Sequence, residues 1–262
     1  MTGKMRYFSA EVDEVARYIT DDAWVMEQKL DGVRCAVTVT ATGVEFSTKS
    51  GAKHHGAIAD ELAAMVGLQV DGELMQTGEL WLFDITAVAG HDLTGVAFTD
   101  RRELLDQLDG LFDNVHVLPS ARGFVAKSVL WASVQESNGE GVIVKRLDGR
   151  YRNASGRTRD VLKIKVTRTV DCVVTGFGSG TDSCVLSLVR DGDLVEVGKV
   201  SLIGKPEVAI GDRVEIRFLY VIDGDSPRLY QGRLVRMRPD KTAAECDWAQ
   251  LDGARTSKLV VA

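Results

Sequence analysis

Residues 27–35 read "EQKLDGVRC" and place Lys29 immediately before an Asp-Gly turn signal. The following "CAVTVT" (35–40) and "GVEFST" (43–48) alternate apolar and polar residues around "ATG", which is typical of a β-hairpin. A strand and a tight turn are therefore expected to hold Lys29 in place. A lysine on a charged helix face would instead be free in solvent.

The composition indicates a folded chain with a sizeable hydrophobic core. The chain has 262 residues, of which 45% are hydrophobic and only 4 are proline, enough for one large domain or two smaller ones. No run approaches the roughly 18 apolar residues of a membrane span, and the N-terminus lacks the apolar core of a signal peptide. We therefore expect a cytoplasmic protein with no membrane partner.

The cysteines indicate neither a zinc site nor a disulfide framework, because they lack short paired spacings. We expect free, mostly buried thiols at Cys35, Cys172, Cys184 and Cys246.

The charge is unevenly distributed along the chain. The formal net charge of −6 argues by itself against a nucleic-acid partner. Residues 145–168, however, contain nine basic and two acidic residues, and attraction to phosphate depends on the local field rather than on the total. A basic groove and an ordinary solvated loop both remain open on this evidence.

Helical spacing of apolar residues predicts three helices, over residues 9–20 behind Ser9 as a cap, over 57–67 ending at Gly67, and over 98–111 behind Thr99. Strands are predicted from alternation or from short apolar runs. Besides the hairpin, they are "LQVDGELM" (68–75), "ELWLFDI" (79–85), "GVIVKR" (141–146) and "VLKIKV" (161–166).

The pattern changes near residue 168. Five strand-like runs follow within about ninety residues, separated by Gly, Asp and Ser, with almost no helical spacing between them. Short strands at this density suit a small barrel of the oligonucleotide-binding (OB) type. We therefore expect two domains, residues 1–168 and residues 169–262.

Five further motifs follow the K-x-D-G-x-R of residues 29–34 in a fixed order. They are "VDGEL" (70–74), "WLFDI" (81–85), "EGVIVKR" (140–146), "VLKIK" (161–165) and "RMRPDK" (236–241). This set resembles the covalent nucleotidyltransferases, the superfamily of ATP-dependent DNA ligases, RNA ligases and mRNA capping enzymes. The resemblance covers nearly the whole chain. It implies an α+β, ATP-grasp-like catalytic domain of antiparallel sheets with flanking helices, followed by a five-stranded OB-fold barrel.

The resemblance implies that Lys29 attacks the α-phosphate of ATP, expels pyrophosphate and keeps AMP as a phosphoramidate. Such a lysine must be a neutral amine, and cationic neighbours lower its pKa. Lys163 and Lys165 alternate on a predicted strand and so point to one face, where they would clamp the α-phosphate. A strand with one solvated face would give the same spacing.

The remaining nucleotide contacts follow from the same resemblance. Glu27 would accept from the adenine amino group, which a carboxylate suits better than the guanine carbonyl, and Phe83 would stack on the base, although the pattern alone would make it a core residue. Glu140 would bind the metal, Mg²⁺ with Mn²⁺ as an alternative, and Glu73 the ribose or a second metal position. The further nucleotide contacts are Asp31, Gly32, Arg34 and Arg238.

Nicked double-stranded DNA is the implied substrate. Arg34 and Lys49 would meet its phosphates, with Lys49 standing where the resembling ligases have a two-pronged arginine. The basic run Arg150, Arg152, Arg157 and Arg159 would follow the backbone. In "RMRPDK", Arg236, Arg238, Asp240 and Lys241 match a barrel motif that orients the departing pyrophosphate, and Pro239 is a variation within it.

We expect a monomer that seals nicks with 5′-phosphate and 3′-hydroxyl ends, brought to DNA by its two domains or by a recruiting repair or replication protein. Three alternatives remain open. The chain could be an RNA ligase, a GTP-dependent capping guanylyltransferase, against which Glu27 argues, or an idle nucleic-acid-binding module with relic motifs.

Overall fold

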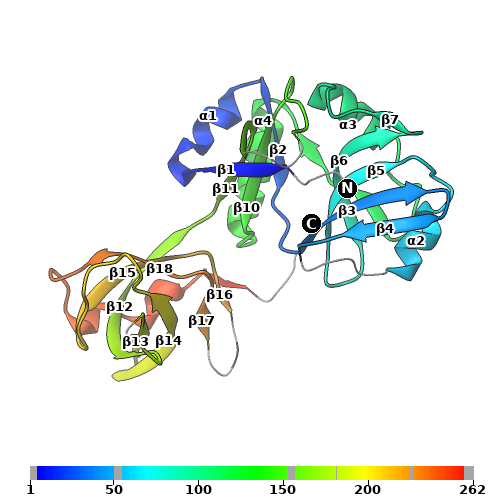
Figure 1. Cartoon of the computed structure of the whole chain (residues 1–262). Coiled ribbons are helices and arrows are strands. Elements are labelled where there is room, and N and C mark those ends of the chain that lie inside the picture. Colours follow the sequence, from blue (N-terminus) through cyan, green and yellow to red (C-terminus); the bar gives the residue numbers. More distant parts are fainter. Residues whose placement is uncertain are drawn as a thin grey trace. The chain divides into compact units, whose positions relative to one another are not determined.

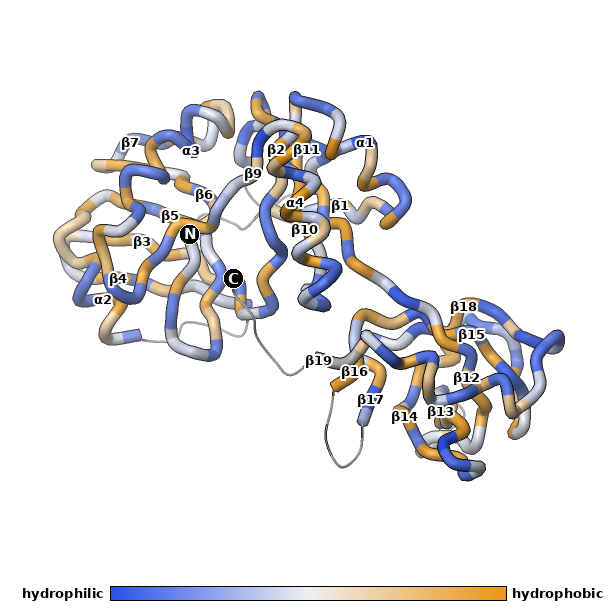
Figure 2. The backbone as a smooth tube through the Cα atoms, turned by 180° about the vertical axis from the view of Figure 1, so that it is seen from behind, coloured by the Kyte–Doolittle hydropathy of each residue, from blue (hydrophilic) through white to orange (hydrophobic). Residues whose placement is uncertain are grey.

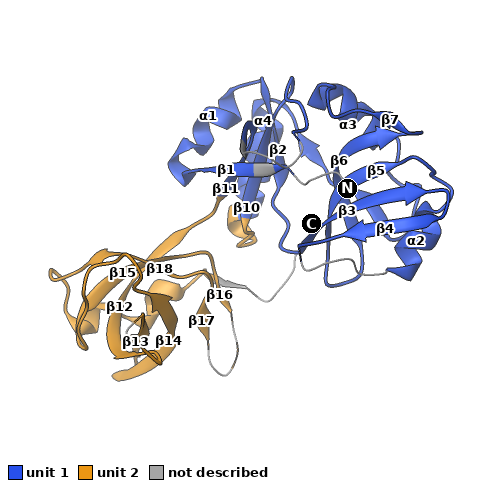
Figure 3. Cartoon of the chain, in the orientation of Figure 1, with its two compact units in different colours: residues 1–134, 141–164 blue, residues 135–140, 165–262 orange. Residues whose placement is uncertain are grey.

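The computed structural model describes residues 5–49, 55–152, 157–180, 182–222, 224 and 227–256. The chain divides into two compact units (Figure 1, Figure 3): unit 1 is Met1–Val134 with Gly141–Ile164, and unit 2 is Gln135–Glu140 with Lys165–Ala262. Both are built on mainly antiparallel sheets, and the fold class is mixed α+β. In the part of the chain that is described, no helix is long and apolar enough to span a membrane.

The first sheet of unit 1 has the strand order β1-β11-β10-β2-β9. β1 runs parallel to β11, and β2 is antiparallel to both β10 and β9. The strand bounds are β1 Arg6–Ala10, β2 Trp24–Gln28, β9 Ser120–Ala121, β10 Gly141–Arg146 and β11 Arg157–Lys165. β2 lies inside this sheet and ends directly before Lys29, so the position of Lys29 is fixed by pairing on both sides.

The second sheet of unit 1 has the order β4-β3-β5-β6-β7, with β8 added parallel to β6. The bounds are β3 Val33–Thr40, β4 Gly43–Ser47, β5 Gln69–Leu74, β6 Leu80–Val88, β7 His91–Asp92 and β8 Val115–Val117. The predicted hairpin is confirmed as β3 and β4. β3 also pairs with β5, which sets Arg34 opposite Glu73.

Helices cover parts of these sheets. They are α1 Val15–Thr20, α2 Gly56–Leu62, α3 Phe98–Asp106 and α4 Gly123–Glu136. Ile58 and Leu62 of α2 and Leu105 of α3 join one core cluster with the inward-facing residues of the second sheet. α3 lies against β6, and this contact brings Arg101 and Arg102 into the protein interior.

Unit 2 contains a five-stranded antiparallel sheet in the order β14-β13-β12-β15-β18 and a small sheet β17-β16-β19. The bounds are β12 Arg168–Phe177, β13 Ser183–Arg190, β14 Asp193–Ser201, β15 Arg213–Phe218, β16 Val221–Ile222, β17 Arg228–Leu229, β18 Arg233–Met237 and β19 Arg255–Thr256. Apolar and polar residues alternate along its strands (Figure 2), so one face forms a separate core. The short 3₁₀ helices η2 Ala243–Glu245 and η3 Trp248–Leu251 pack against β12 and β13.

The structure corrects the helix boundaries. Ser9 does not cap a helix but lies in β1, paired with Lys163 of β11, because tertiary pairing overrides the local helical spacing. Helical structure begins only at Val12, as the 3₁₀ helix η1 Val12–Glu14. The second helix ends at Leu62 rather than Gly67, and the third begins before Thr99 and ends at Asp106.

α4 was not predicted, because its apolar residues lie all round the helix rather than on one stripe. All four cysteines are free and buried, as expected.

Candidate active site

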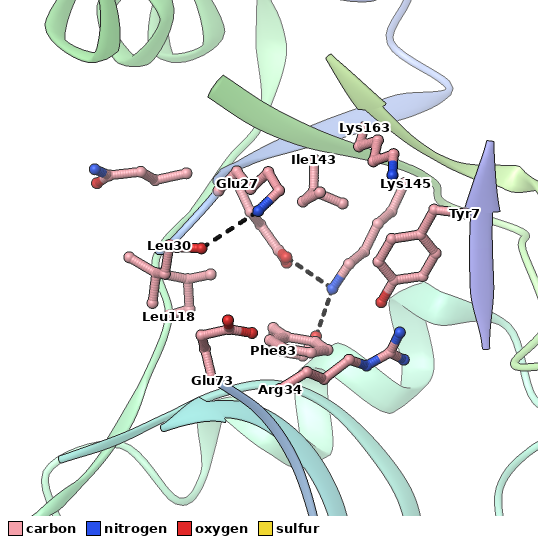
Figure 4. A pocket seen from close by; sticks show the side chains of 12 residues that line it. Tyr7, Glu27, Leu30, Arg34, Glu73, Phe83, Leu118, Ile143, Lys145 and Lys163 are labelled. Atoms are coloured by element: carbon pink, nitrogen blue, oxygen red, sulfur yellow. Dashed lines mark hydrogen bonds and ion pairs between the residues drawn. The ribbon is translucent and has the colours of Figure 1, made fainter. Parts of the chain in front are cut away.

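A pocket in unit 1 gathers residues from several of the sequence motifs (Figure 4). Strands β1, β2, β10 and β11 of the first sheet contribute lining residues, and so do β3, β5 and β6 of the second sheet. Its lining residues are Tyr7, Glu27, Gln28, Lys29, Leu30, Arg34, Glu73, Phe83, Leu118, Ile143, Lys145 and Lys163. Six of these were predicted as site residues from the sequence: Glu27, Lys29, Arg34, Glu73, Phe83 and Lys163.

Lys29 enters the pocket from the end of β2. Its backbone N–H donates to the Gly141 carbonyl at 2.9 Å, which continues the β2–β10 pairing by one residue. Its side-chain Nζ lies 3.5 Å from the Leu30 carbonyl oxygen. The backbone at Lys29 is thus fixed while its partly buried side chain faces the pocket.

The turn after Lys29 closes tightly onto β5. A Cβ at Gly32 would lie 2.6 Å from the Leu74 carbonyl oxygen and 2.9 Å from Cγ of Glu73. The Gly32 N–H donates to Oε1 of Glu73 at 3.2 Å. Only glycine allows this close approach, so the turn fixes the backbone after Lys29 next to the Glu73 carboxylate. Asp31, in the same turn, is exposed and does not line the pocket.

Glu73 is a carboxyl group near its titration point at neutral pH. Burial raises its pKa to about 7, against the opposing effects of Lys29 and of the Gly32 N–H. A bound cation or a second donor would favour its ionised form.

Glu27 is buried at the centre of a charged cluster. Its Oε2 pairs with Nζ of Lys145 at 2.7 Å, and its Oε1 lies 3.4 Å from Arg102. Burial raises the pKa of Glu27, and the two cations lower it in part. Nζ of Lys145 also donates to the Phe83 carbonyl oxygen at 2.6 Å. One ammonium group therefore holds both residues expected to recognise the base.

Arg34 forms the side of the pocket next to Phe83. Its Nε donates to Asp71 at 3.1 Å, and Asp71 also accepts from the Tyr151 hydroxyl at 2.7 Å. The guanidinium carbon lies 4.8 Å from the centroid of the Tyr7 ring and 5.6 Å from that of Phe83. These contacts hold the guanidinium in a single place on the pocket wall.

The two lysines of β11 have different surroundings. Lys163 lines the pocket. Lys165 belongs to unit 2, where it pairs with Glu140 at 2.7 Å and donates to Gln231 at 2.9 Å. Lys163 is therefore the lysine that the structure places with Lys29, while Lys165 and Glu140 satisfy each other.

Carboxylate oxygens are the donors that the site offers to a metal ion. Among the residues that the structure describes, no group of three or more His, Cys, Asp or Glu side chains could hold a metal alone. Of the two predicted carboxylates, Glu73 lines the pocket and Glu140 does not. A single carboxylate nevertheless suits Mg²⁺, which keeps several water ligands and binds through one or two carboxylates and substrate phosphates. The donor set fits Mg²⁺ on these terms.

The residues of "RMRPDK" form a charged network within unit 2. Arg236 pairs with Glu215, and Lys241 pairs with Glu245 at 3.0 Å. Arg238 bridges Asp171 and Asp240, each at 2.8 Å. The guanidinium lowers the pKa of Asp240 to about 2, so this carboxylate is ionised at neutral pH.

The residues expected to bind DNA are mostly exposed. Lys49, Arg150, Arg152 and Arg159 are exposed on unit 1. Nε of Arg152 lies 3.8 Å from Asp160, and Arg159 lies 5.9 Å from the centroid of the Phe8 ring. Residues 153–156 and the side chain of Arg157 lie outside the described part of the chain.

Sequence reasoning missed several lining residues, chiefly Tyr7, Leu118, Ile143 and Lys145. A signal existed for Lys145, since in "EGVIVKR" it alternates with Ile143 on the same strand face. Tyr7 gave no signal, because its place depends on the parallel pairing of β1 with β11.

Comparisons with known proteins agree with one another. The family model described as RNA ligase matches residues 22–165. The multifunctional non-homologous end joining DNA repair protein LigD of Mycobacterium tuberculosis is 26% identical over 208 residues, covering 68% of this chain and 27% of LigD. DNA ligase C of the same organism is 36% identical over 131 residues, covering 45% of this chain and 36% of that protein. The chain thus spans well under half the length of these relatives.

The solved structure of a Lig E DNA ligase, studied for "DNA binding with a minimal scaffold", superposes with a TM-score of 0.65 at 19% identity, covering 91% of this chain and all (100%) of that one. At this identity the likeness concerns the fold, and it extends over both units.

Proposed function

The chain belongs to the RNA ligase family, and we propose that it is an ATP-dependent DNA ligase that works through a lysine-AMP intermediate. One observation carries the proposal. Lys29 shares a single pocket with Glu27, Glu73, Phe83 and Lys163, and these five residues come from four separate stretches of the sequence. An ordinary surface lysine would not be expected to lie among these side chains.

Three displacements at phosphorus make up the reaction. The neutral Nζ of Lys29 attacks the α-phosphorus of ATP, the bond to the bridging oxygen breaks, and pyrophosphate leaves. A 5′-phosphate oxygen at a nick then displaces Lys29 and takes up AMP. The neighbouring 3′-hydroxyl finally attacks the 5′-phosphorus, so AMP leaves and the phosphodiester bond is formed.

The chain supplies positioning and positive charge for these steps. Lys163 faces the same pocket as Lys29, where its ammonium group would offset charge on the non-bridging phosphate oxygens. Lys165 would also contact the phosphate when another cation replaces it as the partner of Glu140. Mg²⁺, held by Glu140 with Glu73 at the ribose or a second metal position, would neutralise phosphate charge.

Base recognition is assigned to Glu27 and Phe83. The ionised carboxylate accepts hydrogen bonds only, which suits the amino group of adenine, and Phe83 offers a ring in the pocket wall. The turn residues Asp31 and Gly32, with Arg34, would complete the nucleotide contacts. A capping guanylyltransferase using GTP is disfavoured by Glu27.

Residues 169–262, which make up most of unit 2, are proposed to be an OB-type module that follows a catalytic domain of residues 1–168. Its five-stranded antiparallel sheet supports this, since the edge strands β14 and β18 also contact each other, as in a curled sheet. Arg238, Asp240 and Lys241 would act on the leaving pyrophosphate, which requires the module to move between steps.

Nicked double-stranded DNA is the proposed substrate, because the similar LigD, DNA ligase C and Lig E proteins are named for DNA ligation or repair. Arg34, Lys49, Arg150, Arg152, Arg157 and Arg159 would contact its phosphates. The enzyme is proposed to act as a monomer, with a repair or replication protein as a recruiting partner. RNA ligation is the second candidate, since the matching family model carries that description.

The test is sealing of matched nicked duplexes, one all DNA and one with RNA on both sides of the nick, with ATP and Mg²⁺. Sealing of the DNA duplex supports the proposal. Preferential sealing of the RNA nick would move the chain to the second candidate, and no sealing of either would refute both.

A further inference from the structure

Lys145 occupies an unusual position for a lysine. It lies in β10 opposite Val25 of β2, and its side chain is only 2% exposed. Figure 4 shows its side chain reaching across the pocket wall between Glu27 and Phe83. The ammonium nitrogen lies 2.7 Å from Oε2 of Glu27, 2.6 Å from the Phe83 carbonyl oxygen and 5.0 Å from the Phe83 ring centroid.

We propose that Lys145 is the positioning residue for nucleotide choice, because one buried ammonium group fixes Glu27 and Phe83 in place and keeps Glu27 a hydrogen-bond acceptor. The inference rests on the proposed function, in which these two residues recognise adenine. Lys145 itself acts through them.

The charge state of Glu27 links Lys145 to base choice. An ionised carboxylate can only accept hydrogen bonds, whereas a protonated carboxyl group can also donate one. The adenine amino group is a donor, and the guanine 6-carbonyl oxygen is an acceptor. Loss of the ammonium group would let Glu27 take up a proton and so serve guanine as well.

Other groups near Glu27 do not replace Lys145. Burial raises the pKa of Glu27 and nearby Asp84 adds to this, while Lys145 and Arg102 oppose it. The phenol of Tyr7 also lies within the electrostatic reach of Glu27. Arg102 is the other cation, but at 3.4 Å it is farther from Glu27 than Lys145 is.

Arg102 is also held by other partners. It donates to the Leu118 carbonyl oxygen and to Asp106, each at 2.7 Å. Lys145 therefore makes the shorter contact with Glu27 and is the only one of these two cations that also holds Phe83.

The test compares Lys145→Met with Lys127→Met. Lys127 is also a buried lysine, 0% exposed, whose Nζ donates to the carbonyl oxygens of Tyr18, Asp21 and Trp24, and it does not line the pocket. The readouts are kcat and KM for adduct formation with α-labelled ATP and with α-labelled GTP, each from pH 6 to 9, together with Tm.

For Lys145→Met we expect the ATP-over-GTP ratio of kcat/KM to fall about tenfold or more, equal to ~1.4 kcal/mol, mainly through KM for ATP. The ratio should recover as the pH rises, because Glu27 ionises again. Lys145→Arg, which keeps the charge, should restore most of the preference. Lys127→Met should lower Tm and leave the ratio unchanged.

An unchanged ratio in Lys145→Met, with Tm lowered as in Lys127→Met, would overturn the inference. Should Lys145→Met not fold, Lys145→Gln replaces it, because its amide can still donate to the Phe83 carbonyl oxygen but carries no charge beside Glu27. Loss of the preference is again expected, and a retained preference overturns the inference. No wild-type adduct with either nucleotide would instead refute the proposed function.

Discussion

Replacing Gly32 by alanine tests the turn that joins Lys29 to Glu73. The added Cβ would lie 2.6 Å from the Leu74 carbonyl oxygen, 2.9 Å from Cγ of Glu73 and 3.1 Å from Sδ of Met75. The first contact is with backbone of β5, so the turn itself must shift. Such overpacking costs about 1–3 kcal/mol, or a fall in Tm of roughly 2–12 °C for a protein of this size.

The catalytic effect should exceed the effect on stability. A displacement of about 1 Å at a reacting group can cost ~100-fold in rate, and Lys29 lies only three residues before the obstructed position. Single-turnover adenylation by Gly32→Ala should therefore be slower by about two orders of magnitude. Gly95→Ala is the matched control, because a Cβ there would meet nothing within 4 Å. Adenylation by folded Gly32→Ala within threefold of wild type would refute the reasoning.

Three further predictions follow from the buried charges. Burial raises the pKa of Glu73 to about 7, from an ordinary 4.5. Between pH 4.5 and 7 the folded protein therefore binds more protons at Glu73 than the unfolded protein does, so the free energy of unfolding falls as the pH rises. In Glu73→Gln, measured by urea unfolding, this fall should be smaller by ~1–3 kcal/mol. The same fall in wild type and variant would contradict the prediction. Lys127→Met loses three hydrogen bonds to backbone carbonyls and should unfold ~2–4 kcal/mol more easily, with normal adduct formation. Arg101→Met removes the cationic partner of buried Asp84, which keeps the hydrogen bond from the Ile85 N–H. This should cost ~3–5 kcal/mol, measured by the same urea titration, and a cost under ~1 kcal/mol would contradict the expectation.

The sequence predicted the strands better than the helices. Alternation in 35–48 and the apolar run at 141–146 predicted β3, β4 and β10 close to their observed bounds, and the run at 161–166 predicted β11 without its first four residues. Residues 9 and 10 were wrongly predicted to begin a helix, because their strand conformation comes from pairing with β11, about 150 residues away. The local spacing of residues cannot predict pairing with so distant a strand.

In the site, too, residues in local motifs were predicted and a residue placed by distant packing was not. Lys29, Glu27, Glu73 and Phe83 are fixed by short motifs on paired strands, and the structure brings them to one pocket. Lys145 was counted only as part of a basic segment, since its burial depends on α3 and β6 packing against β10. Alternation places Lys145 on the same strand face as Ile143, but it does not show which distant side chains surround Lys145.

The assignment of Lys29 as the nucleophile is tested by locating the nucleotide on the protein. Wild type and Lys29→Ala are each incubated with Mg²⁺ and α-labelled ATP or GTP, denatured, and analysed by gel and by peptide mass spectrometry. We expect one AMP on Lys29 of the wild type, little label from GTP, and none on Lys29→Ala. An adduct that survives in Lys29→Ala, or that maps to another residue, would contradict this assignment.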